Sequence, residues 1–368
     1  MSAQSKDKIA LEFLQDPRFS RSFELPADPA DDHPGLQVKY ADYGYHNPTT
    51  PEAEHVLLFF APLCASRMLH CAKDELAKKN HVRIVVMDRP GFGGTDPVKL
   101  DQRPFLCRKM TLALLQHLGI KHVSVASHSG GTIYALDMLL HHPEILHPER
   151  SYIAIGAPWI LPSRSSLWSP RLIQSLPNSM LGQADKVIGF VAGTLGPAFA
   201  PSAIIGEIIK GSFGPGTGAS DVSSPDAVLE ESLESILFGF LQSESIKGFS
   251  DESQFLMQKV EGISGWGDWL DYDDLMPKLA EVLKKAGRKL TVEIFYGEQD
   301  SLIGAHGTCG TKWLDSCWEG DQTKEVVVYK THVVKGTNHD TIWSIRRGVP
   351  EEVLKKVGTQ EDRERGLD

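Results

Sequence analysis

Short, mainly apolar runs recur along the first half of the chain, and segments with helical spacing separate them. Residues 55–62 and 81–88 are typical of strands that are buried on both faces of a sheet. Residues 36–44 alternate in the manner of a strand, and residues 122–127 and 150–158 form two further short runs. The pattern therefore predicts strands at all five places.

Three segments between these runs have the spacing of helices. Residues 66–80 are polar enough for a surface helix, and residues 101–119 end at Gly119, a residue type that commonly closes a helix. Residues 131–146 are predicted to form the third helix. Such alternation indicates an α/β fold, with a largely parallel sheet covered by helices on both faces.

The alternation stops after residue 158 and returns after residue 288. Residues 159–288 contain no convincing buried strand, whereas strand patterns recur in the residues that follow. We therefore expect a core in two parts, residues 1–158 and 289–368, with residues 1–20 as an N-terminal extension. The segment between the two parts is expected to be a helical insertion.

One stretch of the insertion, residues 187–206, is uncharged over the length of a membrane-spanning helix. Pro197 and Pro201 lie in its second half, and both would break a helix that packs against lipid alone. We therefore expect no membrane span and interpret the stretch as a short apolar element that covers a pocket. The sequence leaves open whether it is a lid, a subunit interface or a membrane-associating segment, and it does not define the oligomeric state.

Composition limits the classes of binding partner and the cellular compartment that we expect for the protein. The 368 residues are 41% hydrophobic and 23% charged, and the formal net charge is -10, so the chain resembles a globular protein with an acidic surface. This charge argues against nucleic acid as the main partner. Five cysteines without metal-ligand spacing favour reduced thiols and a cytoplasmic location, and the charged N-terminus lacks the apolar core of a signal peptide.

Ser129 lies between a predicted strand and a predicted helix, with Ser127 two residues before it and Gly131 two residues after it. Small residues at these positions permit a sharp, strained turn that displays the serine as a nucleophile. The N-terminus of the following helix would direct N–H groups at an oxyanion formed there. The pattern usually has glycine in the place of Ser127.

A serine hydroxyl needs a base to accept its proton and an acid to orient that base. Asp300 follows a predicted strand at residues 289–297, and His339 lies in the loop after the last predicted strand, at residues 324–336. Ligands of doubly wound sheets bind at the C-terminal ends of the strands, so Ser129, Asp300 and His339 are expected to meet there. Their chain order, serine, acid and histidine, is much harder to obtain by chance than the serine motif alone.

Three further motifs resemble those of the α/β-hydrolase fold family. Residues 88–96 resemble its glycine-containing loop after the fourth strand, residues 295–300 its Gly-x-x-Asp acid motif, and residues 336–339 its histidine loop. The resemblance covers residues 36–158 and 289–357, which is most of the chain outside the insertion. It implies an α/β-hydrolase fold.

The resemblance also implies roles for particular residues. Ser129 would be the nucleophile, His339 the general base and acid, and Asp300 the carboxylate that orients the histidine. The insertion, residues 159–288, would be a helical cap that shapes the substrate pocket. No metal ion or organic cofactor is implied.

The groups around the serine are less strongly defined. One oxyanion donor is expected to be the N–H of Gly130, and the other an N–H in the loop after the second predicted strand. Family members often have His-Gly there, but this chain has Ala-Pro, and proline has no N–H, so Leu63 is the first choice and Cys64 the second. His128, Cys64 and Trp159 are candidates for the wall of the substrate pocket, although core packing explains them as well.

These residues together predict a serine hydrolase that acts on an ester, lactone or thioester of a small apolar molecule. The same triad in this family also cleaves carbon–carbon bonds of diketones, or peptides with a free N-terminus. A ligand-binding or biosynthetic protein without acyl chemistry is a further alternative. Arg67 and Arg89 are expected to brace active-site loops rather than to bind substrate.

Overall fold

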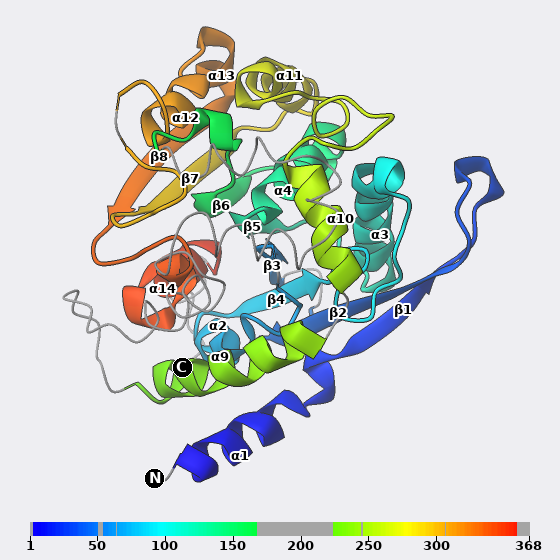
Figure 1. Cartoon of the computed structure of the whole chain (residues 1–368), viewed down its shortest axis with the longest axis vertical. Coiled ribbons are helices and arrows are strands. Elements are labelled where there is room, and N and C mark those ends of the chain that lie inside the picture. The colour runs from blue at the N-terminus through cyan, green and yellow to red at the C-terminus, as the bar shows by residue number, and fades with distance from the viewer. Residues whose placement is uncertain are drawn as a thin grey trace, which may run out of the picture.

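An eight-stranded sheet forms the centre of the molecule, in the strand order β1-β2-β4-β3-β5-β6-β7-β8 (Figure 1). β1 pairs antiparallel with β2, and β2 antiparallel with β4, whereas all the remaining pairs are parallel. The prediction of an α/β fold with a mostly parallel sheet is therefore confirmed. The computed structural model describes residues 3–50, 54–63, 65–167, 224–243, 246–305 and 307–358.

All five strands predicted in the first half of the chain are present, with ends that differ from the prediction by at most two residues. The edge strand β1 was not predicted, because its five residues are too few for a clear alternation of polar and apolar positions in the sequence. The fifth strand, β5, continues to Ser129, so the predicted nucleophile is the last residue of a central strand. The strands are β1 (Arg21–Leu25), β2 (Leu36–Gly44), β3 (His55–Phe60), β4 (Val82–Met87), β5 (Ser124–Ser129), β6 (Tyr152–Pro158), β7 (Leu290–Gly297) and β8 (Val327–Val334).

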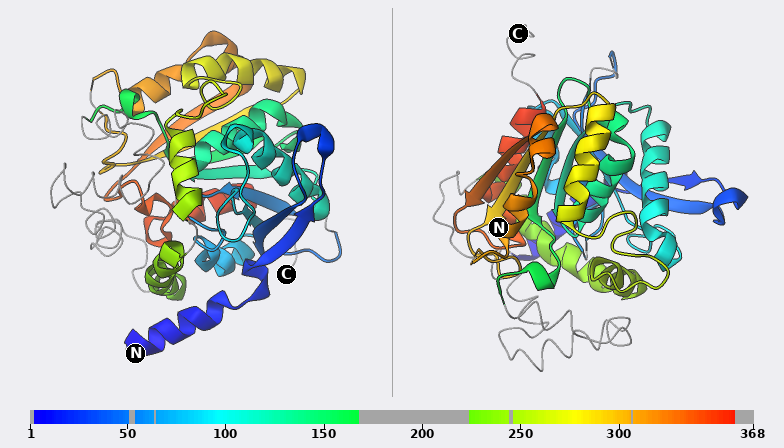
Figure 2. Two further views of the ribbon diagram at one scale, coloured as in Figure 1. Left: turned by 45° about the vertical axis from the view of Figure 1, so that its right-hand side comes forward. Right: turned by 90° about the horizontal axis from the view of Figure 1, so that it is seen from above.

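Both faces of the sheet are buried, as the apolar runs predicted. Along β3, Leu58 and Phe60 contribute to one hydrophobic core, and Leu57 and Phe59 to the other, because successive side chains of a strand point to opposite faces. Figure 2 shows the helices on the two sides of the sheet. The first core includes residues of α3 (Arg103–His117), α4 (Gly131–His141) and α11 (Tyr272–Lys285), and the second includes residues of α1 (Ala3–Leu14), α2 (Asp74–Lys79), α9 (Pro225–Ser243) and α14 (Val349–Val357).

The ends of the predicted helices were less accurate than those of the strands. Gly119 has a φ of 67° just after α3, which confirms the predicted glycine cap. The helix predicted over residues 131–146 was too long, because α4 ends at His141 and Pro143 begins a separate 3-10 turn. Of the helix predicted over residues 66–80, only α2 and a preceding 3-10 turn formed.

The described parts of the insertion, residues 159–167, 224–243 and 246–288, contain no strand. They include α9, α10 (Ile246–Leu256) and α11, and α11 packs against α4 and α13 (Asp321–Val326) of the core. The apolar stretch at residues 187–206 lies outside the described residues. Within the described part of the chain, no helix combines the length and the apolar character that crossing a bilayer would require.

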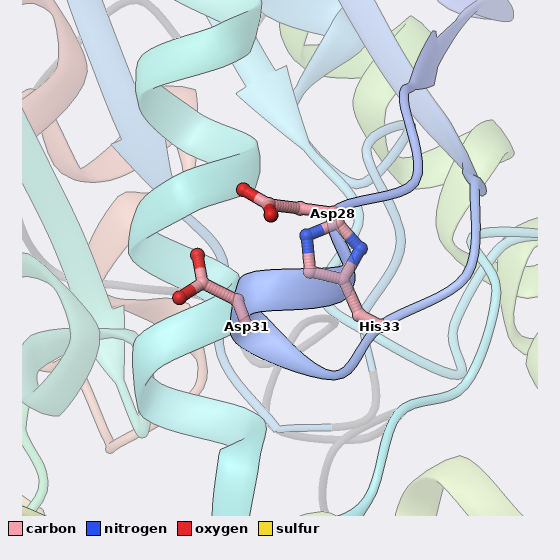
Figure 3. A group of neighbouring side chains, drawn as sticks. All are labelled: Asp28, Asp31 and His33. Atoms are coloured by element: carbon pink, nitrogen blue, oxygen red, sulfur yellow. The ribbon is translucent and has the colours of Figure 1, made fainter.

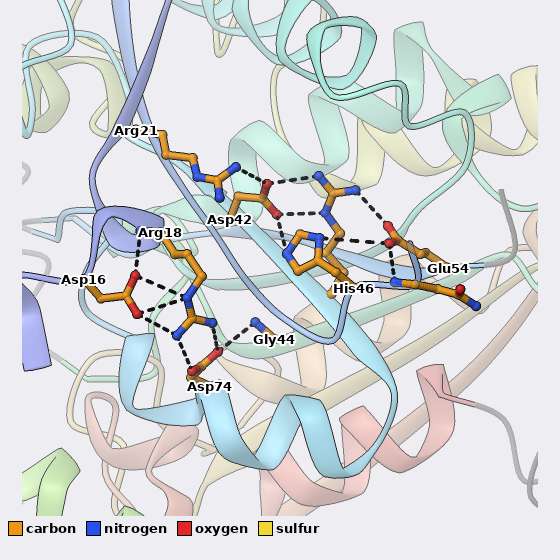
Figure 4. A network of polar contacts seen from close by, with 10 residues as sticks. Asp16, Arg18, Arg21, Asp42, Gly44, His46, Glu54 and Asp74 are labelled. Carbon is orange, nitrogen blue, oxygen red and sulfur yellow. Dashed lines mark hydrogen bonds and ion pairs between the residues drawn. The ribbon is translucent and has the colours of Figure 1, made fainter. Parts of the chain in front are cut away.

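A buried polar network fixes the segment before β1 to the sheet (Figure 4). Two oxygens of Asp74 accept hydrogen bonds from Arg18, both at 2.9 Å, and one of them also accepts from the backbone N–H of Gly44 at 2.8 Å. Asp42 on β2 pairs with Arg83 on β4 at 2.8 and 3.0 Å. Because both carboxylates are almost fully buried, these partners are needed to offset the cost of desolvation.

Candidate active site

Ser129 lies on a sharp bend between β5 and α4. Its φ is 49°, in the left-handed region that non-glycine residues rarely occupy. A Cβ atom on Gly131 would lie 2.2 Å from the carbonyl oxygen of Phe60 and 2.5 Å from that of Ala61, so only glycine fits there. The backbone N–H of Trp159 also donates to the carbonyl of Ser129, at 3.2 Å. The bend is therefore held by close backbone packing.

Ser127, which stands where the family usually has glycine, is completely buried. Its hydroxyl lies 3.3 Å from the hydroxyl of Thr132 in the first turn of α4, and its carbonyl accepts a hydrogen bond from the Trp343 indole at 3.1 Å. The serine thus fits because a neighbouring side chain satisfies the additional polar group.

The structure brings the three predicted catalytic residues into one hydrogen-bonded chain. Nε2 of His339 lies 2.8 Å from Oγ of Ser129, and Nδ1 of His339 lies 2.8 Å from Oδ2 of Asp300. Asp300 follows β7 and His339 follows β8, so the C-terminal ends of parallel strands place both residues beside Ser129. The other carboxylate oxygen of Asp300 accepts from the backbone N–H groups of Leu302 and Ile303, at 2.8 and 3.0 Å.

The charge of Asp300 and the burial of His339 together set the protonation state of His339. Burial lowers the pKa of His339, but the charge and hydrogen bond of Asp300 outweigh this, so the pKa lies above its ordinary value of 6.5. Burial likewise raises the pKa of Asp300, and the nearby His339 together with the two backbone donors brings it below 3.8. The ionised carboxylate holds a proton on Nδ1, which leaves the lone pair of Nε2 facing the Ser129 hydroxyl.

His128, a candidate for the pocket wall, is buried beside His339. Its Nε2 lies 2.8 Å from the backbone carbonyl of His339, and because a carbonyl only accepts, Nε2 must carry a proton. Burial lowers the pKa of His128 to about 3, so its ring is neutral near pH 7. The contact shows His128 supporting the loop that carries His339.

The two predicted oxyanion donors border the same small space. A Cβ atom on Gly130 would lie 3.6 Å from the backbone nitrogen of Leu63 and 2.8 Å from a methyl group of Leu256, the last residue of α10. Glycine at this position therefore leaves room between the loop after β3 and the insertion. Cys64 lies outside the described residues. Trp159 is half-buried, and its indole N–H donates to the carbonyl of Leu256 at 3.2 Å.

A buried ion-pair cluster braces the loop that carries Leu63. The guanidinium of Arg89 donates to the carbonyls of Ala61 and Pro62, the latter at 2.7 Å. Nε of Arg89 lies 2.8 Å from Oε1 of Glu252 on α10, and Glu252 is fully buried. The other oxygen of Glu252 pairs with Arg103. The predicted bracing role of Arg89 is confirmed, but Glu252 was missed, because no pattern in the insertion distinguishes it from surface carboxylates.

Arg67 braces the second active-site loop predicted from the sequence. Its backbone N–H and its guanidinium both donate to the carboxylate of Asp88, and the guanidinium also donates to the carbonyl of Gly93 at 2.8 Å. A Cβ atom on Gly93 would collide with the Asp88 carboxylate, at 1.8 Å. This arrangement confirms the predicted bracing role of Arg67 and explains the glycine in the loop at residues 88–96.

We expect Arg89→Met to reduce kcat by about 10-fold or more, because a lost oxyanion donor costs about 10²–10³-fold and this change releases the Leu63 loop. Arg103→Met is the matched control, since Arg103 pairs with the same Glu252 but donates to neither loop carbonyl. Both variants should lower the free energy of unfolding, by about 3–5 kcal/mol. Ester turnover per folded molecule, with the folded fraction from urea titration, separates the effect on kcat from the effect on stability. Equal losses of kcat in Arg89→Met and Arg103→Met would contradict the bracing role of Arg89.

A cavity of about 550 Å³ lies at the N-terminal ends of the central strands, opposite to the end of β5 that carries Ser129. It is bordered by the first residues of strands β3, β5 and β6, including His55, Ser124 and Tyr152. Since ligands of open α/β sheets bind at the C-terminal ends of strands and neither Ser129, Asp300 nor His339 borders this cavity, it is separate from the candidate active site.

Comparison with known proteins places the chain by its fold. No protein-family model and no curated protein sequence matches it. An esterase from Exiguobacterium antarcticum has a TM-score of 0.56 at 14% identity, with 88% of this chain and 97% of that chain covered. An alpha/beta hydrolase enzyme from a Medee basin deep-sea metagenome library has a TM-score of 0.55 at 14% identity, covering 94% and 99%.

The enol-lactonase from Burkholderia xenovorans is also similar, with a TM-score of 0.50 at 12% identity over 88% of this chain and 97% of that chain. The eight-stranded, mostly parallel sheet with flanking helices agrees with these similarities. The chain therefore has the α/β-hydrolase fold, as its motifs predicted.

Proposed function

We propose that the protein is a serine hydrolase that cleaves an ester, lactone or thioester of a small apolar molecule through an acyl-enzyme on Ser129. The observation that carries this proposal is the hydrogen-bonded chain from Ser129 through His339 to Asp300, with 2.8 Å at both links. The fold supports the same class of reaction, because similar structures include an esterase and an enol-lactonase.

The first half of the reaction uses the lone pair of His339. Oγ of Ser129 attacks the substrate carbonyl while its proton passes to Nε2 of His339, and Asp300 stabilises the imidazolium that forms. The carbonyl oxygen becomes an oxyanion, to which the N–H groups of Gly130 and Leu63 would donate. The tetrahedral intermediate then collapses, the bond to the leaving group breaks, and His339 returns its proton to that group.

Water completes the reaction through the same residues. His339 accepts a proton from water as the hydroxide attacks the acyl carbonyl, and it then protonates Oγ of Ser129 as the acid is released. The carboxylate of Asp300 raises the pKa of His339, which favours the imidazolium that forms in both steps. Neither step requires a metal ion or an organic cofactor.

A substrate panel tests the reaction class. We expect turnover of short-chain p-nitrophenyl esters or of simple lactones, and covalent labelling of the protein by a fluorophosphonate probe, read by intact mass. Cleavage of 1,3-diketones without ester turnover would favour carbon–carbon bond hydrolysis instead. Folded protein that neither turns over any carbonyl substrate nor reacts with the probe would contradict a serine hydrolase.

A further inference from the structure

Three side chains with metal-binding atoms converge in the loop between β1 and β2, away from the candidate active site. They are Asp28, Asp31 and His33, and one ligand atom from each lies within 4.8 Å of the other two (Figure 3). Both aspartates are partly buried, whereas His33 is only 5% exposed. The group therefore combines two carboxylates near the surface with one buried imidazole.

Backbone hydrogen bonds fix the positions of these residues independently of one another's side chains. Asp28 and His33 exchange two backbone hydrogen bonds, at 3.2 and 3.3 Å, and the N–H of Asp31 donates to the carbonyl of Asp28 at 3.2 Å. The side chain of Asp28 also caps the short 3-10 turn by accepting from Ala30 at 3.0 Å. Such a preformed loop lowers the entropy cost of placing three ligands around one ion.

His33 has a buried nitrogen that the protein leaves without a partner. Its Nδ1 lies 2.7 Å from the carbonyl of Pro34, and because a carbonyl only accepts, Nδ1 carries the proton. Nε2 then has a lone pair, and it is buried with no hydrogen-bond partner in the described part of the chain. The imidazole is turned toward the carboxylates of Asp28 and Asp31 (Figure 3). A buried acceptor that faces two other acceptors is unfavourable unless a cation lies between them.

The two carboxylates already attract a cation. The ammonium group of Lys109 on α3 lies 2.7 Å from Oδ2 of Asp28 and 2.5 Å from Oδ2 of Asp31. Its hydrogen bond holds the pKa of Asp28 below the ordinary value. Among the described residues, however, no hydrogen bond joins Lys109 to His33, so the ammonium satisfies the carboxylates and not the imidazole.

We propose that Asp28, Asp31 and His33 bind a divalent transition-metal ion of the Zn²⁺ type, in competition with the ammonium group of Lys109. An imidazole with two carboxylates suits such an ion better than Ca²⁺ or Mg²⁺, which prefer oxygen ligands only. Zn²⁺ bonds of about 2 Å require the ligand atoms to be about 3.3 Å apart, so side chains whose ligand atoms lie within 4.8 Å of one another would rotate toward the ion. The ion would join the β1–β2 loop into one rigid unit and release Lys109, and it takes no part in the proposed hydrolysis.

The test is Zn²⁺ titration of the whole, EDTA-treated chain against a chromophoric chelator. We expect one Zn²⁺ to bind, at least 10-fold weaker binding in His33→Gln and in Asp31→Asn, and at least 10-fold tighter binding in Lys109→Met, because that change removes the competing ammonium. Ca²⁺ should not displace the Zn²⁺. Co²⁺ in place of Zn²⁺ should give visible absorption bands of a nitrogen- and oxygen-ligated ion, which disappear in His33→Gln.

A second group of three, Glu293, His332 and Glu352, provides the matched control. There Nε2 of His332 also lacks a hydrogen-bond partner among the described residues, but it lies 3.7 Å from Oε1 of Glu293, and Glu352 is exposed. His332 is also less buried than His33. Glu352→Gln should therefore leave the Zn²⁺ stoichiometry and affinity unchanged. Wild-type protein that does not bind Zn²⁺, or binding that is equal in wild type, His33→Gln and Asp31→Asn, would overturn the proposal, and thermal unfolding of each variant confirms that the comparison uses folded protein.

Discussion

Replacement of Ser129 by alanine is expected to lower kcat for ester hydrolysis by roughly 10⁶-fold, the loss seen when the nucleophile of a serine–histidine–aspartate site is removed. The variant loses the oxygen that lies 2.8 Å from Nε2 of His339, so no acyl-enzyme can form on this bend. Stability should change little, because alanine keeps the small side chain at a φ of 49°. Steady-state turnover and fluorophosphonate labelling, read by intact mass, measure the two losses together.

Ser127→Ala is the matched control for this variant. It removes a serine hydroxyl two residues away, in the same strand, and costs only the contact with Thr132, about 1 kcal/mol of stability. Labelling and kcat should stay within a few-fold of the wild type. If Ser129→Ala protein is still labelled at the wild-type rate, the nucleophile is another residue, and the proposed function fails.

The sequence was most informative where a local pattern had only one physical explanation. The continuous apolar runs predicted buried parallel strands, and the order serine, acid, histidine then predicted which loops would meet, because parallel strands end at one edge of a sheet. The structure places Ser129, Asp300 and His339 as this reasoning expected. Their catalytic roles remain predictions until the variants are measured.

Contacts between distant segments were not predicted where no motif marked the residues that make them. Glu252 lies in the insertion and pairs with Arg89, far away along the chain, so no spacing rule connects them. The sequence also did not predict that Nε2 of His33 lacks a hydrogen-bond partner among the described residues, because this depends on the conformation of the β1–β2 loop. Helix ends were misjudged where proline or a 3-10 turn interrupted an otherwise helical pattern, as at Pro143.

Replacement of Asp300 by asparagine should lower kcat by about 10⁴-fold while the fold stays intact. One oxygen of Asp300 is held by the N–H groups of Leu302 and Ile303, and the amide oxygen of asparagine would take over both bonds. The amide NH₂ group must then face Nδ1 of His339, where the wild type has a carboxylate oxygen. A donor at that place favours the tautomer with the proton on Nε2, which has no lone pair to accept the proton of Ser129.

The pH dependence gives this variant a second, independent readout. The base must be neutral to act, so kcat/KM of the wild type should rise with pH through the pKa of His339, which lies above 6.5. In Asp300→Asn the carboxylate no longer favours the imidazolium, and burial alone moves the pKa below 6.5, so the residual activity should rise at lower pH. Asp340→Asn removes a neighbouring charge that raises the same pKa less than Asp300 does, and it should keep most of the rate. An acid limb that is unchanged in Asp300→Asn would show that another group orients His339.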